Sequence, residues 1–250
     1  MSHLRLFVRF ILVGSHVLLA AIIAPLCFMS GKHGKLKPFQ RRLIQWEMRF
    51  CLKLLGIKIH RIGQATQKVQ LIVSNHISWI DILVIGSTIS SCFLSKAEVR
   101  KWPIIGKLTI RYGTIFITRG QDSHLVREEI TRRLADDINV VLFPEGTTSD
   151  GRSVRPFFPR LMATAIDSDT SIQPVSLRYF NDNRISDIAP FTSDRSLLSH
   201  AIQLLKQKST DAFICFGPPI TPQGKDRSSL AKQAHTTVLE GVIKTSPPLP

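Results

Sequence analysis

Beyond Gly63 the chain alternates short apolar runs with longer stretches in which apolar residues recur every three or four positions. Short apolar runs bounded by polar or turn residues predict strands, and the longer periodic stretches predict helices. The expected strands cover residues 69–73, 91–94, 113–117, 139–143, 172–177 and 212–216, and the expected helices cover residues 80–89, 123–137, 196–208 and 228–243. This alternation is typical of an α/β fold, and we expect a central mixed sheet flanked by helices.

An almost wholly apolar segment lies near the start of the chain, at residues 10–29, and Ser15, His16 and Pro25 interrupt it. About twenty apolar residues are needed for a helix to cross the hydrocarbon core of a bilayer. A cleaved signal peptide or a buried core helix can have a similar composition, but the segment is long for a signal peptide and no clear cleavage motif follows it. Flanking Lys and Arg residues favour a membrane-embedded helix, and whether it spans or re-enters the membrane stays open.

The next segment, residues 39–57, predicts a basic amphipathic helix. Leu43, Trp46, Phe50 and Leu54 recur at helical spacing, and Lys and Arg residues occupy another face. Such a helix either lies in the membrane interface or packs on the protein's own core. The pattern leaves both alternatives open.

A length of 250 residues accommodates one sizeable α/β domain with an appendage rather than two full domains. We therefore expect an N-terminal pair of membrane-associated helices within residues 1–62, an α/β domain at residues 63–245 and a tail at residues 246–250. The cysteines lie far apart and form no C-x-x-C pair, which indicates a reduced, cytosol-facing domain with neither a zinc site nor a disulfide framework. They are Cys27, Cys51, Cys92 and Cys215.

The formal net charge of +15 requires a negatively charged partner, such as nucleic acid, anionic lipid or an acidic carrier protein. The chain has no zinc-finger spacing, no RNP-type aromatic run and no heptad zipper, so we expect no nucleic-acid partner. More cations follow the apolar segment than precede it, which places most of the chain in the cytoplasm, at the inner membrane if the protein is bacterial. The cations compared are Arg5 and Arg9 before the segment, and Lys32, Lys35, Lys37, Arg41 and Arg42 after it.

The first candidate for chemistry is the pair His76 and Asp81 in the stretch N-H-I-S-W-I-D, directly after an expected strand. On one continuous helix the two residues would point about 140° apart, so they can meet only if His76 precedes the helix. Ser78 and Asp81 have the spacing of a capping box, which starts the helix just after Ser78. In that arrangement the imidazole is a general base and the carboxylate orients it. The alternative is that Asp81 only caps the helix and His76 is a turn residue.

Two further polar segments also follow expected strands. Residues 113–120, G-T-I-F-I-T-R-G, place Arg119 at a strand end, where its guanidinium can bind phosphate or carboxylate or can simply be solvated. Residues 143–151, F-P-E-G-T-T-S-D-G, are rich in small residues whose backbone N–H groups can converge on an anion. In open α/β sheets ligands bind at the carboxyl ends of strands, so we expect one shared site. No H-E-x-x-H motif or ordered carboxylate–histidine cluster is present, and we predict no metal.

In combination these segments resemble the glycerolipid acyltransferase family that includes the 1-acylglycerol-3-phosphate acyltransferases. The family's first block, N-H-x-x-x-x-D, matches residues 75–81, and its second block, a glycine-started strand ending in Arg, matches residues 113–119. Its third block, F-P-E-G-T-x-S, matches residues 143–149, and its fourth block, an apolar strand around a proline, matches residues 172–175. Order and spacing agree from about residue 69 to about residue 177.

The resemblance implies transfer of an acyl group from acyl-CoA or acyl carrier protein to a lysophospholipid hydroxyl, above all 1-acylglycerol-3-phosphate, which would give phosphatidic acid. It implies His76 as the general base, Asp81 as its orienting partner and no cofactor besides the acyl donor. The residues it assigns to substrate binding are Asn75, Lys96, Gly113, Arg119, Glu145, Gly146, Thr147 and Pro174. The N-terminal helices resemble the membrane-docking pair of this family, through which a lysolipid would pass from the bilayer to the site.

Two alternatives to this function remain. The same chemistry can act on another lysolipid, such as lyso-ornithine lipid, because the third block alone does not determine the head group. A protein of another class, an inactive membrane lipid-binding protein with the same fold, would also account for the basic and apolar segments. The presence of His76, Asp81 and Glu145 argues against an inactive protein.

Overall fold

The computed structural model describes residues 2–27, 36–118, 123–192 and 195–245. Its helices are α1 (Ser2–Cys27), α2 (Pro38–Leu55), α3 (Ile80–Thr88), α4 (Ile105–Arg111), α5 (Ser123–Ala135), α6 (Ala163–Asp167), α7 (Leu197–Lys206) and α8 (Arg227–Lys244). Its strands are β1 (Ile57–Ile62), β2 (Leu71–Ser74), β3 (Ser91–Lys96), β4 (Ile115–Ile117), β5 (Asn139–Leu142), β6 (Ile172–Asn181), β7 (Arg184–Ile185) and β8 (Thr210–Phe216). Two short 3₁₀ helices, Ala97–Lys101 and Pro159–Met162, complete the set.

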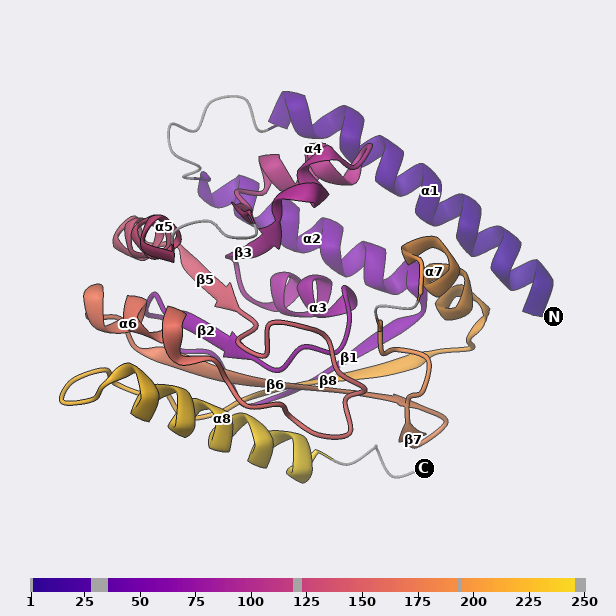
Figure 1. Ribbon diagram of the computed structural model, residues 1–250. Helices are drawn as coiled ribbons and strands as arrows, with labels where there is room; N and C mark the ends of the chain where they lie inside the picture. Colours follow the sequence, from indigo (N-terminus) through magenta and orange to yellow (C-terminus); the bar gives the residue numbers. More distant parts are fainter. Residues whose placement is uncertain (1, 28–35, 119–122, 193–194, 246–250) are drawn as a thin grey trace.

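The strands form one mixed sheet in the order β1-β8-β6-β2-β5-β3-β4, with β7 paired to β6. β6 runs antiparallel to β8 and β7, and the other neighbouring pairs are parallel. Helices cover both faces of this sheet, with α8 on one side and α2 and α3 on the other (Figure 1). The expected α/β fold with a mixed sheet and flanking helices is therefore confirmed.

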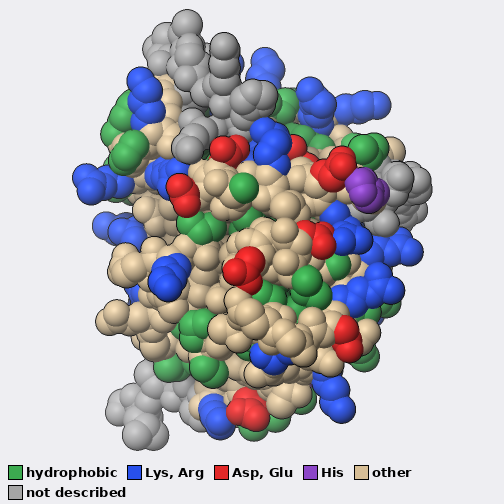
Figure 2. Space-filling model, turned by 90° about the vertical axis from the view of Figure 1, so that its left-hand side faces the viewer, with side chains coloured by type: hydrophobic (Ala, Val, Ile, Leu, Met, Phe, Trp, Pro, Cys, Tyr) green, Lys and Arg blue, Asp and Glu red, His purple; other side chains and the backbone are tan. Residues whose placement is uncertain are grey.

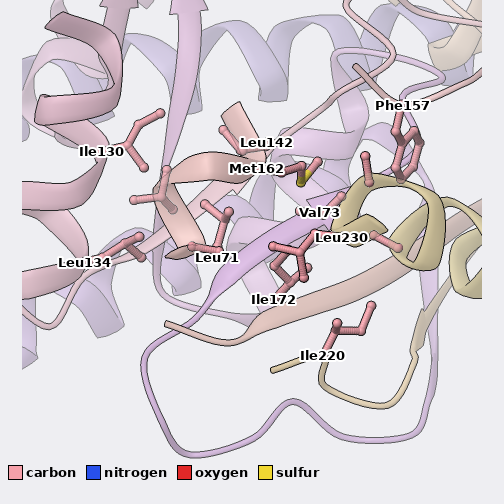
Figure 3. Packing of buried hydrophobic residues seen from close by; sticks show 14 of the residues in the cluster. Leu71, Val73, Ile130, Leu134, Leu142, Phe157, Met162, Ile172, Ile220 and Leu230 are labelled. Atoms are coloured by element: carbon pink, nitrogen blue, oxygen red, sulfur yellow. The ribbon is translucent and has the colours of Figure 1, made fainter. Parts of the chain in front are cut away.

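Each face of the sheet buries its own apolar cluster. Figure 3 shows the cluster beneath α8, where Leu71 and Val73 of β2 meet Ile172 of β6 and Leu230 of α8. On the opposite face the alternate residues of the same strands, such as Ile72, pack against α3. Because β2 is buried on both faces, its sequence reads as a continuous apolar run.

The structure corrects the expected boundary after the second helix. α2 ends at Leu55 because Gly56 adopts φ 77° and its N–H caps the Leu52 and Lys53 carbonyl groups. Residues 57–62, expected to belong to the N-terminal segment, instead form the edge strand β1, which pairs with β8. β1, β7, α4 and α6 had not been predicted.

The structure shows that one face of α2 packs on the protein's own core. Ile44, Met48 and Leu52 point into the protein and are buried. The stripe that suggested an interfacial anchor lies on another face, and Trp46 on that stripe is 57% exposed and stacks on Phe50. The residues of the core-packing face had not been singled out, because the aromatic stripe dominated the pattern.

α1 is apolar over most of its surface, with Arg5 and Arg9 near its N-terminus. One face, which includes Leu6, Val13 and Ala20, packs on the protein. α1 lies along α7, α2 and α4 rather than projecting away from them (Figure 1). The Arg9 guanidinium fastens it by donating to the Gln207 carbonyl at 2.7 Å and the Lys208 carbonyl at 3.1 Å, just beyond the C-terminus of α7.

Candidate active site

The first and third sequence blocks meet at the carboxyl ends of parallel strands. β2 lies between β5 and β6, with Val73 beside Leu142 and Ser74 beside Val175. The chain leaving β2 carries His76 and the chain leaving β5 carries Glu145, so strand pairing brings the two segments together. This is the edge of an open α/β sheet at which ligands bind.

His76 and Asp81 are in contact. The Nδ1 atom of His76 lies 2.7 Å from Oδ2 of Asp81, whose side chain is fully buried, while 20% of the His76 side chain is exposed. α3 begins at Ile80, which leaves His76 outside the helix and places Asp81 in the first turn, as the spacing had predicted. A buried carboxylate beside a partly exposed imidazole can orient the imidazole and stabilise its protonated form.

Asp81 accepts hydrogen bonds from four donors. Oδ2 accepts from Nδ1 of His76, from the Ile77 N–H at 2.7 Å and from the Ser78 N–H at 2.9 Å. Oδ1 accepts from the Tyr179 hydroxyl at 2.6 Å. Four donors match the roughly four lone-pair sites of an ionised carboxylate, which can only accept. Nδ1 of His76 must therefore carry the hydrogen, and the lone pair is on Nε2.

The capping box at Ser78 is only half formed. Asp81 receives the Ser78 N–H, as expected, but the helix N-cap is Trp79 and has no side-chain cap. The Ser78 hydroxyl has no hydrogen-bond partner in the part of the chain that the structure describes. The carboxylate closes this turn through Oδ2, and its second oxygen is held by Tyr179, a contact absent from the local sequence pattern.

The backbone and ring of His76 are held by the third block. The His76 N–H donates to Oε1 of Glu145 at 2.7 Å, and the His76 carbonyl accepts from the Ser149 N–H at 2.8 Å. The imidazole stacks on the ring of Phe143, with centroids 4.0 Å apart. Nε2 of His76 makes no hydrogen bond within residues 2–27, 36–118, 123–192 and 195–245. It is therefore free to meet a substrate.

Residues 56–178 match the sequence profile of a family described as Acyltransferase. A lyso-ornithine lipid O-acyltransferase from Pseudomonas aeruginosa is 39% identical to this chain over 212 residues, which cover 84% of the chain and 82% of the relative. The chain belongs to the acyltransferase family. This acyltransferase is also 27% identical to the 1-acyl-sn-glycerol-3-phosphate acyltransferase of Neisseria gonorrhoeae, over 74% of the chain and 73% of the relative.

A solved structure has the same fold. The 1-acyl-sn-glycerophosphate acyltransferase PlsC from Thermotoga maritima superposes with a TM-score of 0.77 and 19% identity over 100% of both chains. The resemblance drawn from the sequence blocks is thus confirmed at the level of family and fold.

Glu145 of this acyltransferase has a different position from the one expected of a head-group ligand. Its side chain is buried, and its two oxygens accept from the His76 N–H and, at 3.0 Å, from the Arg155 N–H. Burial raises the pKa of Glu145, and the two N–H groups act in the opposite direction. The carboxylate joins three segments of the site. Its neighbours Gly146 and Thr147 are the exposed part of the turn.

The other predicted binding residues are spread over the same domain. Asn75 is buried and uses both ends of its amide on Leu177, donating to its carbonyl at 3.0 Å and accepting its N–H at 2.8 Å. Pro174 is buried in β6 and its carbonyl accepts from the Gly217 N–H at 3.0 Å. Three predicted binding residues remain. Lys96 is exposed at the end of β3, and Gly113 lies in the turn before β4 with φ 78°. Arg119 lies outside the described residues.

Two site residues of this acyltransferase had not been singled out. Phe143 is the first residue of the third block and its ring supports the imidazole, so its place in the block was an available signal. Tyr179 lies 98 positions from Asp81 and reads as an ordinary strand residue, so no local pattern could have identified it. Among the described residues no three His, Cys, Asp or Glu side chains are grouped as a metal site would require.

Proposed function

We propose that this acyltransferase transfers an acyl group from the thioester of acyl-CoA or acyl carrier protein to the hydroxyl of a lysolipid. The observation that carries the proposal is the partly exposed His76, whose Nδ1 is held by buried Asp81 and whose Nε2 has a free lone pair. A neutral imidazole so placed can take the proton of a hydroxyl group as its oxygen attacks a carbonyl carbon.

The reaction balances without a cofactor. The acceptor oxygen forms the new ester bond, the bond between the carbonyl carbon and sulfur breaks, and the proton held on Nε2 passes to the departing thiolate. Asp81 stabilises the imidazolium that exists between these two proton transfers. The thioester is already activated, so alignment of the two substrates contributes much of the acceleration.

Lyso-ornithine lipid is the acceptor that we propose first. The support is the 39% identity to a lyso-ornithine lipid O-acyltransferase, together with 30% identity to a second enzyme of that name from Brucella abortus over 92% of the chain and 91% of the relative. The second candidate is 1-acylglycerol-3-phosphate, supported by relatives of that specificity at 27% identity. Head-group binding by Lys96, Arg119, Gly146 and Thr147 remains a prediction for either acceptor.

An acceptor comparison tests the proposal. The purified full chain is supplied with labelled acyl-CoA or acyl carrier protein and with either lyso-ornithine lipid or 1-acylglycerol-3-phosphate. We expect labelled product with at least one donor, with a higher kcat/KM on lyso-ornithine lipid, and none with the His76→Ala variant. A higher kcat/KM on the phosphate acceptor would establish the second candidate instead. Absence of transfer to either acceptor by a correctly folded protein would contradict an acyl-transfer function for these lipids.

We also propose that α1 lies in the membrane interface and holds the domain at the cytoplasmic face. Leu4, Phe7, Ile11, Leu18 and Ile22 fall within about 60° of one another on the helix and are between 48% and 70% exposed. This face is opposite the one that packs on the protein, and only 6% of the residues in the 18-residue apolar window within His3–Ala24 are buried. An apolar face of this size matches lipid chains rather than water.

The surface charge supports the same placement. Figure 2 shows the side of the molecule that lies at the left of Figure 1, where Lys and Arg side chains are spread over the surface with Asp and Glu among them. Combined with the net charge of +15, this favours broad attraction to an anionic membrane surface.

Replacing Phe7, Leu18 and Ile22 with serine is expected to release the protein from membranes. Each side chain contributes roughly 1.5–3 kcal/mol when transferred from water to an apolar phase, so the loss is about 5 kcal/mol or more. Co-sedimentation with liposomes measures the loss of membrane binding. Truncation of α1 is a poorer test, because Arg9 and the packed face of the helix also stabilise the domain.

The matched control replaces Leu125, Leu198 and Ile243 with serine. These residues lie on α5, α7 and α8 and are 54%, 61% and 66% exposed. The control should sediment with liposomes like the unmodified protein. If the α1 variant also remained bound as tightly as the unmodified protein, α1 would not be the anchor.

A further inference from the structure

Tyr179 is the one side chain that holds the far oxygen of Asp81. It lies on β6, near the centre of the sheet, and its hydroxyl donates to Oδ1 of Asp81 at 2.6 Å while His76 occupies Oδ2. Among the described residues no other donor to Oδ1 is present. The carboxylate is thus held on both sides, by the strand beneath it and by the turn that carries His76.

We propose that Tyr179 is a positioning residue for acyl transfer. It acts on His76 through Asp81, which is hydrogen-bonded to both residues. The proposal rests on the proposed function, because it requires His76 to act as the base. Tyr179 does not touch a substrate, since it is buried beneath α3 and is 2% exposed. Its contribution is to fix the plane of the carboxylate and so the direction of Nε2.

The surroundings of Tyr179 keep its hydroxyl protonated, so it can always donate a hydrogen bond to Asp81. Burial and the Asp81 carboxylate raise the pKa of Tyr179 well above its ordinary value, so the hydroxyl keeps its hydrogen throughout the pH range in which an enzyme works. A buried hydroxyl that donates to a carboxylate disperses the carboxylate's negative charge. Removing that donor leaves Oδ1 without a partner in an apolar pocket.

The effect on the pH dependence has a definite sign. The charged groups that face His76 are Asp81 from α3 and Glu145 from the segment after β5, and Tyr179 faces Asp81 from β6. Without the Tyr179 hydroxyl the undispersed charge of Asp81 stabilises the imidazolium of His76 more. This change favours the protonated state of His76, so the acid limb of the rate profile moves to higher pH.

The test is Tyr179→Phe, which keeps the ring and removes the hydroxyl. We expect kcat to fall about tenfold, the effect of a hydrogen bond to a charged group, with the KM of both substrates unchanged. We also expect the acid limb of kcat against pH to move upward. Steady-state assays between pH 5 and pH 9, with the fraction of folded protein measured by circular dichroism, separate these effects from unfolding.

The only other tyrosine of the chain provides the control. Tyr112 also donates to a buried carboxylate, that of Glu47, but it lies between α2 and α4 and has no contact with His76 or Asp81. Tyr112→Phe should alter thermal stability without moving kcat or the pH profile. If Tyr179→Phe behaves in the same way while His76→Ala is inactive, the positioning role is wrong and the proposed function stands. If His76→Ala is fully active, the proposed function itself fails.

Discussion

Replacing His76 with alanine is expected to lower the rate of acyl transfer by roughly 10³-fold, because no other base is in place to accept the proton of the attacking hydroxyl. Stability should change little. The bonds that hold residue 76 to Glu145 and Ser149 are made by its backbone, which the substitution keeps. The measurement is thiol release from acyl-CoA in the presence of acceptor, with the melting temperature recorded in parallel.

A second histidine–aspartate pair makes the control for this experiment. His60 on β1 lies 2.7 Å from Asp211 on β8, the same separation as in the site, and its ring stacks on Phe213. His60→Ala therefore removes an equivalent contact from the edge of the sheet and should leave turnover unchanged. Full activity of the His76→Ala variant would show that the proton is taken by another group and would overturn the proposed mechanism.

Replacing Asp81 with asparagine is expected to reduce both activity and stability. An amide has one acceptor oxygen, so its NH₂ group must face at least one of the four donors that Asp81 now satisfies. His76 also loses the partner that selects its tautomer, a change that costs on the order of 10⁴-fold in rate in a comparable arrangement. The loss of stability should be about 3 kcal/mol, since buried donors are left unpaired. Urea unfolding and the thiol-release assay measure the two effects.

Asp211→Asn is the corresponding control. Its carboxylate bonds to His60, and 17% of its side chain is exposed, so water can replace the lost interaction. We expect a change in stability below about 1 kcal/mol and unchanged turnover. If Asp81→Asn unfolded at the same urea concentration as the unmodified protein, the four-donor account of the turn would be wrong.

The elements with a strong local pattern were predictable. β2 and β5 are buried and appear as continuous apolar runs, and α3, α5, α7 and α8 follow from helical periodicity. Apart from β1, the elements that were missed are short. α4 has seven residues and packs in one cluster with α1 and α2, and it depends on that packing because so short a helix is marginal in isolation.

Within the site, the role of Glu145 illustrates the limit of local reasoning. The block around it was recognised, and the family resemblance assigned Glu145 to substrate binding. The structure instead pairs it with the backbones of His76 and Arg155. Whether a polar side chain faces solvent or a neighbouring loop depends on strands that are adjacent in the sheet but distant in the chain.

The sequence alone determined the alternation of strands and helices, the apolar N-terminal segment, and the placement of His76 on a turn with Asp81 in the helix that follows. These features depend on residues within a few positions of one another, where helix geometry and capping decide the outcome. Only the tertiary structure decided which face of α2 is buried and which residue holds the second oxygen of Asp81. The pairing of β2 with β6 brings Tyr179 beneath α3, and a contact between residues 98 positions apart arises from that pairing rather than from any local pattern.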